Sequence, residues 1–133
     1  MKLTARSEYA LLALICLARH QGKQPLNGEA IAREQGIPPK FLQQILFALK
    51  RAHYVYSTKG QRGGYRLAKR PGEICLAEIV RLFDGALAPT QSVSEYFYEA
   101  TPIEREAGLL KVFREIRDHV ARKLERTTLA DVR

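Results

Sequence analysis

Two adjacent prolines in the first half of the chain constrain its fold most strongly. Residues 27–35 (NGEAIAREQ) have the pattern of a short helix, with Asn27 as its N-cap and Gly36 at its end. The segment Ile37-Pro38-Pro39 cannot extend that helix, because proline lacks the N–H donor and its ring clashes with the preceding turn. Proline is well tolerated in the first turn of a helix, so a second helix is predicted from here to about His53. The sequence therefore predicts two helices joined by a sharp turn.

The second of these helices is predicted to have one apolar face and one free polar face. Its apolar residues follow the 3,1,3 spacing of a single helical face: Leu42, Ile45, Leu46 and Leu49. Its remaining polar residues fall mostly elsewhere and are free to meet water or a ligand: Lys40, Gln43, Gln44, Lys50 and Arg51.

A glycine-rich hairpin is predicted directly after this helix. The runs YVYST and YRLA have strand character and flank KGQRGG, whose glycines permit the positive φ angles of a tight tip. A glycine-rich basic loop could instead cradle a nucleotide phosphate. However, KGQRGGY lacks the GxxxxGK[ST] pattern and leads into a strand rather than a helix, so this alternative is weak.

Further helices are predicted on both sides of this unit. Ser7–His20 is apolar nearly all round and should form a central core helix with Ser7 as its cap. A short helix is expected over 76–83, followed by a long loop over 85–102 and a long helix over 104–126. One apolar stripe runs along the long helix and could pack on its own domain or on a second copy of the chain: Leu109, Phe113, Ile116, Val120 and Leu124. Thr127 or Thr128 is expected to cap a last short turn.

The charge is distributed unevenly along the chain. Residues 1–70 carry a net charge of +10 and residues 71–133 a net charge of −2, which together give the overall +8. A basic first half suggests a polyanionic partner, although a basic surface also favours solubility. The order helix, turn, helix, basic hairpin favours the first reading, because it is the order of a winged helix-turn-helix domain that binds duplex DNA.

In that fold the second helix enters the major groove, where Lys40, Gln43 and Gln44 could reach base edges. The hairpin would lie along the phosphate backbone or place Arg62 in the minor groove. The predicted DNA-binding residues are Lys40, Gln43, Gln44, Lys50, Arg51, Lys59, Arg62, Gly63, Gly64 and Arg66.

No constellation for catalysis or metal binding stands out. The sequence contains no nucleophile with a base, no phosphate loop and no carboxylate pair in a glycine-rich setting, so an enzyme is not expected. His20, His53 and His119 are interpreted as surface or helix-end residues rather than metal ligands. Cys16 and Cys75 are expected to be buried free thiols. Apolar runs are too short to cross a membrane and no secretory leader is evident, so a cytoplasmic protein is expected.

Several segments together resemble the Rrf2 family of bacterial transcription regulators, which includes the IscR- and NsrR-like sensors. These are the opening MKLTARSEYALLAL, the stretch IAREQGIPPKFLQQILFALKRAHYV and the wing KGQRGGYRLA. The similarity continues through LAEIVRLFDG, the long helix and the terminal TTLADV. The resemblance implies a homodimer whose long helices pair and carry two DNA-reading heads to a palindromic operator. It also places Lys40, Gln43 and Gln44 in the base-reading part of the recognition helix, and Lys59–Tyr65 in the wing.

The resemblance fails at the loop where sensor members of the family hold an iron–sulfur cluster on three cysteines. This chain has no cysteine there, and Ser92, Ala100 and Ala107 stand where thiolates would be expected. Glu8 occupies the position of an acidic cluster ligand in some relatives, but it is interpreted here as a helix-start residue. Because such clusters need thiolate ligands, no iron–sulfur cofactor is expected. The chain is either a cluster-free branch of the family or an engineered cysteine-less variant.

The predicted fold is mainly α with a small β-hairpin wing. Its expected parts are a winged helix-turn-helix domain over 1–84, a sensor-type loop over 85–102, and a dimerisation helix with a C-terminal turn over 103–133. Tyr96, Phe97 and Tyr98 make that loop unusually aromatic. These rings are expected to close the core between head and dimer helices. Alternatively, the loop docks an effector or protein partner that controls DNA binding.

Overall fold

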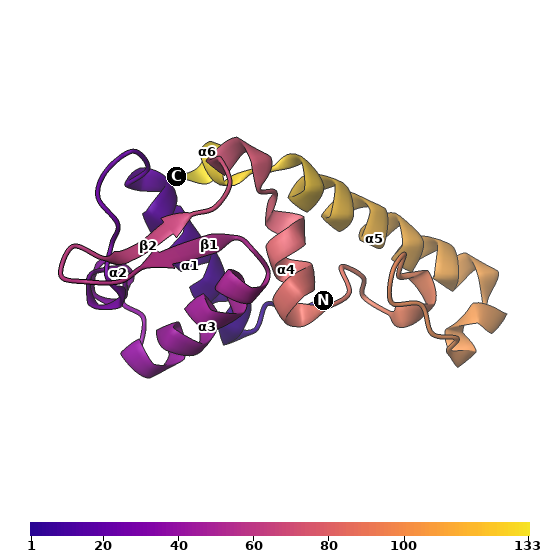
Figure 1. Ribbon diagram of the computed structural model, residues 1–133. Helices are drawn as coiled ribbons and strands as arrows, with labels where there is room; N and C mark the ends of the chain where they lie inside the picture. Colours follow the sequence, from indigo (N-terminus) through magenta and orange to yellow (C-terminus); the bar gives the residue numbers. More distant parts are fainter.

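The central helix α1 (Ala5–Arg19) supports a head from which one long helix projects (Figure 1). The computed structural model describes residues 1–133. The other elements are α2 (Gly28–Gln35), α3 (Pro39–Arg51), β1 (Val55–Thr58), β2 (Gly64–Leu67), α4 (Leu76–Asp84), α5 (Ala107–Arg126) and α6 (Leu129–Val132). Short 3-10 turns lie at η1 (Pro71–Glu73), η2 (Gln91–Val93) and η3 (Pro102–Arg105). The predicted mainly helical fold with a hairpin wing is confirmed.

One apolar cluster holds the head together. Leu14 of α1, Ile31 of α2 and Ile45 of α3 are fully buried in it, as is Leu129 of α6 from the far end of the chain. Each such side chain contributes roughly 1.5–3 kcal/mol when it is removed from water. The four apolar residues predicted for the inner face of α3 are all buried, and α1 is the core helix that the sequence predicted.

The cap of α1 differs from the prediction. Thr4, not Ser7, is the N-cap, and its hydroxyl oxygen accepts a hydrogen bond from the Ser7 N–H. Thr4 takes the cap position because a residue far away in the sequence holds it there. Its N–H and its hydroxyl both donate to the Asp84 carboxylate at the end of α4. Burial opposes ionisation of Asp84, but the hydrogen bonds from Thr4 outweigh it and hold the pKa of Asp84 below its usual value. The N-terminus is thereby fixed against α4.

The turn between α2 and α3 follows the sequence prediction. The Asn27 side chain accepts from the Ala30 N–H, and Gly36 ends α2 in the left-handed region at φ 66°. Pro39 begins α3 at the position that proline tolerates. The helix ends at Arg51 rather than His53, because His53 itself adopts a positive φ of 65°.

The two strands form an antiparallel hairpin with Val55 opposite Leu67 and Thr58 opposite Gly64. Two backbone hydrogen bonds between Leu26 and Tyr65 add the loop before α2 to the outer side of β2. The wing is thus attached to the helix-turn-helix through its own backbone.

The C-terminal segment leaves the head and returns to it. Beyond α4 the chain runs outward through residues 85–106, and α5 returns from the far end to the head (Figure 1), where its Leu124 packs against a small cluster of Ala77, Val80 and Leu87. Backbone hydrogen bonds from Leu76 to Thr127 and from Leu129 to Ile74 then fix the C-terminal segment to the head. Thr128 caps the last turn, as predicted. Helix α5 begins at Ala107, three residues after the predicted start, because Pro102 opens a separate 3-10 turn that ends in extended backbone at Glu106.

The loop between α4 and α5 has a different buried face from the one expected. Ser92, Val93 and Ser94 are buried, whereas the side chains of Tyr96, Phe97 and Tyr98 are exposed by 65%, 42% and 58%. The aromatic rings therefore do not close the core of a single chain. Tyr96 lies under the Arg81 guanidinium, and the Tyr98 hydroxyl donates to Glu104.

Cys16 is fully buried, as predicted, but Cys75 is only half-buried and stands at the N-terminus of α4. No helix combines the length and the apolar composition that a membrane crossing requires.

Candidate nucleic-acid interface

Helix α3 presents a polar outer face whose side chains make no intramolecular hydrogen bond or ion pair. Lys40, Gln43, Gln44, Lys50 and Arg51 are all exposed, and their side chains enter none of the hydrogen bonds or ion pairs of the structure. Gln43, Gln44 and Arg51 line an open groove of about 480 Å³. The expected exposure of these residues is confirmed, and they are free to bind a ligand.

The other residues that line this groove, Arg6, Phe47 and Ala48, are not among the predicted DNA-binding residues. Phe47 is 62% exposed, one helical turn after Gln43, and the Arg51 guanidinium lies 5.8 Å from the centre of its ring. Because Phe47 follows Gln43 by four residues, the two lie on the same face of a helix, and the sequence alone could have placed Phe47 there. Arg6 comes from the first turn of α1 and packs against Phe83. Only the packing of α1 on α3 brings Arg6 to the groove, so no local pattern could reveal it.

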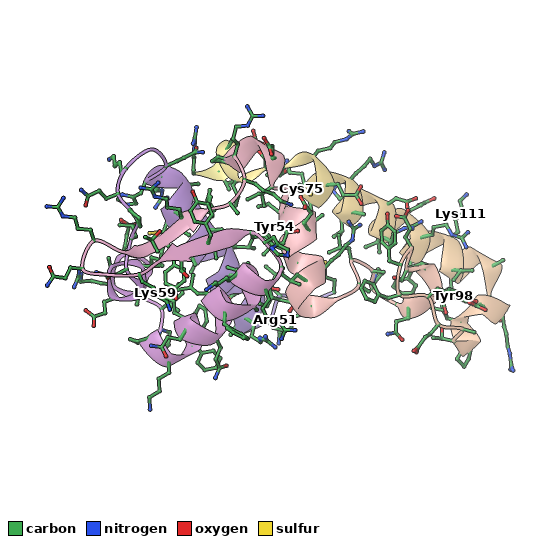
Figure 2. The ribbon with its side chains drawn as sticks, viewed as in Figure 1. Arg51, Tyr54, Lys59, Cys75, Tyr98 and Lys111 are labelled. Atoms are coloured by element: carbon green, nitrogen blue, oxygen red, sulfur yellow. The ribbon has the colours of Figure 1, made fainter.

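The wing carries its basic residues on exposed positions. Lys59, Arg62 and Arg66 are exposed, and Figure 2 shows Lys59 on the hairpin and Arg51 on the head, far from Lys111 on α5. Gly60 and Gly64 have positive φ angles of 102° and 153°. Gly63 is required for a different reason: a Cβ there would lie 2.1 Å from the Thr58 carbonyl oxygen.

The segment that forms this surface carries charge of one sign. No acidic residue occurs between Gly36 and Arg70, the stretch that forms α3, the wing and its flanks, whereas eight lysines and arginines do. Like charges held on one surface produce a positive field that attracts polyanions and raises their rate of association. The arrangement is chemically suited to the phosphate backbone of a nucleic acid.

A second polar cluster joins α1 to α2. The Sγ of Cys16, a ring nitrogen of His20 and a carboxylate oxygen of Glu34 all lie within 4.8 Å of one another. His20 Nε2 is 3.0 Å from Glu34 Oε1. His20 is at the end of α1, as predicted, but the fold also brings Glu34 to it from α2, a contact that the sequence did not predict. The four-residue spacing of Cys16 and His20 was the signal that was missed.

Burial dominates the chemistry of this cluster. Burial, and after it the hydrogen bond to the neighbouring Glu34 carboxylate and the charge of that carboxylate, raise the pKa of the Cys16 thiol to about 12. The same hydrogen bond, together with that from His20, lowers the pKa of Glu34. The thiol is therefore protonated and the carboxylate ionised at neutral pH.

The apolar stripe of α5 divides into two parts. Leu124 faces its own α4, whereas Leu109 and Ile116 are 47% and 44% exposed and Phe113 and Val120 are half-buried. Val112, beside the stripe, is also exposed. The outer part of α5 thus presents apolar side chains that its own chain does not cover.

Comparison with known proteins assigns this fold to a family. The model of the Rrf2 family, described as iron-dependent transcriptional regulator, matches residues 3–133. The chain belongs to the Rrf2 family. It is therefore a helix-turn-helix transcription regulator rather than an enzyme, and DNA binding is implied.

Relatives of this Rrf2 protein match along nearly its whole length. CymR of Bacillus subtilis is 31% identical over 132 residues, which are 99% of this chain and 89% of CymR. The solved structure of CymR, named as the global cysteine regulator of B. subtilis, superposes with a TM-score of 0.81 at 30% identity, covering 99% of this chain and 95% of that one. The structure of T. potens IscR has a TM-score of 0.77 at 26% identity, covering 99% and 85%. Protein rrf2 of Nitratidesulfovibrio vulgaris is 33% identical over 132 residues, 99% of this chain and 87% of the relative.

The iron dependence in the family description can be tested against the residues of this chain. The loop over 85–106 has neither cysteine nor histidine, and Glu8 stands exposed in the first turn of α1 without a thiol beside it. These residues do not fit a thiolate-held cluster. Cys16, His20 and Glu34 are the one group of three or more such donors that the fold assembles, and they offer mixed S, N and O ligands to a single ion.

The attachment of the wing yields a prediction about Gly64. A Cβ at Gly64 would lie 2.4 Å from the Leu26 carbonyl, and its φ of 153° strains any L-residue. Gly64→Ala should therefore lower the free energy of unfolding by about 1–3 kcal/mol in equilibrium urea denaturation. The matched control is Gly72→Ala, where nothing lies within 4 Å of the added Cβ and the change should stay within about 0.5 kcal/mol. Equal effects of the two substitutions would contradict the close approach of Leu26.

Proposed function

We propose that this Rrf2 protein is a sequence-specific, homodimeric regulator that reads a palindromic operator. The observation that carries the proposal is the free, acid-free surface of α3 and the wing. A helix of this size fits the DNA major groove, and glutamine can both donate to and accept from adenine. We assign base contacts to Lys40, Gln43 and Gln44. Backbone contacts belong to the basic residues around them and on the wing: Lys50, Arg51, Lys59, Arg62 and Arg66.

The glycines of the wing are part of the same assignment. Gly63 and Gly64 leave room for the Thr58 carbonyl and for Leu26, which allows the tight tip of the hairpin, and we assign backbone contacts with phosphates to this tip. Arg62 lies exposed beside them and can enter the minor groove.

The second copy of the chain is proposed to cover the outer part of α5. Leu109 and Ile116 leave an apolar stripe in water, which pairing of two α5 helices would bury. Two-fold symmetry then brings two recognition helices to half-sites about 34–36 Å apart, one turn of the double helix. The proposed dimerisation residues are Leu109, Phe113, Ile116 and Val120, with Leu124 holding α5 to its own head.

The first test is selection of bound duplexes from a random pool by the purified, metal-free protein. We expect enrichment of a two-fold palindrome whose half-sites are one helical turn apart. Affinity for the selected duplex should fall by about 10³–10⁵-fold between about 50 and 200 mM salt if six to ten phosphates are contacted. A flat salt dependence without any enriched sequence would refute the proposal.

Substitutions on α3 and the wing should separate the two kinds of contact. Gln43→Ala is expected to cost about 1–3 kcal/mol at particular base pairs and to relax the selected sequence there. Lys59→Ala should weaken binding to all duplexes alike and reduce the slope of log affinity against log salt by about 1. Lys111→Ala, on α5 away from the interface, is the control and should change neither. Uniform losses for Gln43→Ala on every duplex would remove it from the base-reading set.

Sedimentation equilibrium tests the dimer. Ile116→Asp places a charge in the apolar stripe and should shift the chain from dimer to monomer. Arg114→Asp adds the same carboxylate on the opposite face of α5 and should leave the dimer intact. Dimers of unchanged strength with Ile116→Asp would show that α5 does not pair through this stripe.

The exposed aromatic loop favours a second candidate function. Tyr96, Phe97 and Tyr98 could dock a protein partner that controls DNA binding, since all three rings are exposed in the single chain. A partner that co-purifies in stoichiometric amount and is lost with Tyr96→Ala, while the dimer persists, would support docking. Loss of the dimer itself with Tyr96→Ala would place these rings in the interface between the two copies.

A further inference from the structure

The geometry of Cys16, His20 and Glu34 points to a binding site for one divalent transition-metal ion between α1 and α2. The inference goes beyond the proposed DNA binding, because it assigns a ligand to residues that lie outside the α3 and wing surface.

The backbone already holds the three donors together. Cys16 lies in α1 and His20, four residues later, is the C-cap of the same helix, so their side chains lie one turn apart on the same side. Glu34 comes from the last turn of α2, and the adjacent Gln35 side chain donates to the Leu12 carbonyl oxygen at 2.8 Å. This bond ties α2 to α1 beside the site, so binding an ion requires no rearrangement of the helices.

The distances suit a single ion. In a tetrahedral zinc site, metal–ligand bonds of about 2.0–2.3 Å separate neighbouring ligand atoms by about 3.3–3.8 Å. Nε2 of His20 and Oε1 of Glu34 are 3.0 Å apart, and all three donor atoms fall within 4.8 Å. Small rotations of the three side chains can therefore enclose an ion, without any change in the backbone.

The donor set selects the class of ion. One sulfur, one imidazole nitrogen and one carboxylate oxygen suit borderline ions such as Zn²⁺ or Fe²⁺, rather than Mg²⁺ or Ca²⁺, which prefer oxygen alone. Binding displaces the proton of the Cys16 thiol, and the resulting thiolate and the Glu34 carboxylate balance the charge of the ion. His20 and Glu34 are 30% and 38% exposed, so a fourth position opens to water and the ion can exchange with solution.

The site lies beside the elements that carry the proposed DNA-binding surface, so a bound ion can influence that surface. Helix α2 is the first helix of the helix-turn-helix, and Glu34 lies two residues before the Gly36 turn into α3. On its other side His20 lines a cavity of about 150 Å³ together with Tyr65 and Arg66 of the wing. A bound ion therefore restrains His20, which lies between α2 on one side and the wing on the other.

Cobalt(II) is the probe for the test, because a cobalt–thiolate bond produces a charge-transfer absorption that imidazole and carboxylate ligands do not. The full chain, treated with chelator and then dialysed, is titrated with Co²⁺ and afterwards with Zn²⁺ or, without oxygen, Fe²⁺. We expect one Co²⁺ per chain, a thiolate band, and loss of the band as Zn²⁺ displaces Co²⁺. Displacement by Fe²⁺ at lower concentration than Zn²⁺ would identify iron as the preferred ion.

Matched variants assign the ligands. Cys16→Ala should abolish the thiolate band, and Glu34→Gln, an exposed change that preserves the fold, should weaken Co²⁺ binding by at least about tenfold. Cys75→Ala removes the other thiol, and Glu29→Gln changes an exposed carboxylate in the first turn of the same helix; both should bind as the parent does. Absence of the band in the parent chain, its loss with Cys75→Ala, or equal effects of Glu29→Gln and Glu34→Gln would each overturn the site. None of these readouts involves DNA, so the metal site and the proposed regulator function fail or stand separately.

Discussion

Burial of α1 is the constraint on which the rest of the molecule depends. This helix is apolar over most of its length, and α2, α3, α4, α6 and β2 all contact it. Its exposed residues lie near its two ends, and its apolar middle can remain in water only because these elements cover it. The covering elements come from both ends of the sequence, because Leu129 of the last turn is as deeply buried as Leu14 in α1 itself. The orientation of α3, and with it the candidate nucleic-acid interface, follows from this packing.

The features that could be predicted from the sequence are those that depend on residues close together in the chain. The Asn27 cap, the Gly36 turn, Pro39 at the start of α3 and the glycine hairpin each depend on one or a few neighbouring residues. The inner and outer faces of α3 follow from helical spacing alone. The head and its candidate interface could therefore be foreseen in outline.

The features that escaped prediction all depend on contacts between distant segments. Thr4 replaces Ser7 as the cap because Asp84 holds it, and Arg6 reaches the α3 groove because α1 packs there. The aromatic loop exposes its rings and buries its serines, since Ser92 bonds to Thr101 across the loop. The Cys16, His20 and Glu34 cluster needs α2 against α1. Apart from the four-residue spacing of Cys16 and His20, none of these pairings has a period or a motif, so the partners could be identified only in the folded chain.

The acid-free stretch between Gly36 and Arg70 has a consequence for how the molecule moves before it binds. Its positive charge lies at the end of the molecule opposite the projecting helix, which carries charges of both signs (Figure 1). The protein is therefore an electric dipole on the scale of the whole chain. In the field of a polyanion such a dipole experiences a torque that turns α3 and the wing forward before any contact forms. Such alignment shortens the orientational search that slows protein association, and added salt reduces the distance over which it acts.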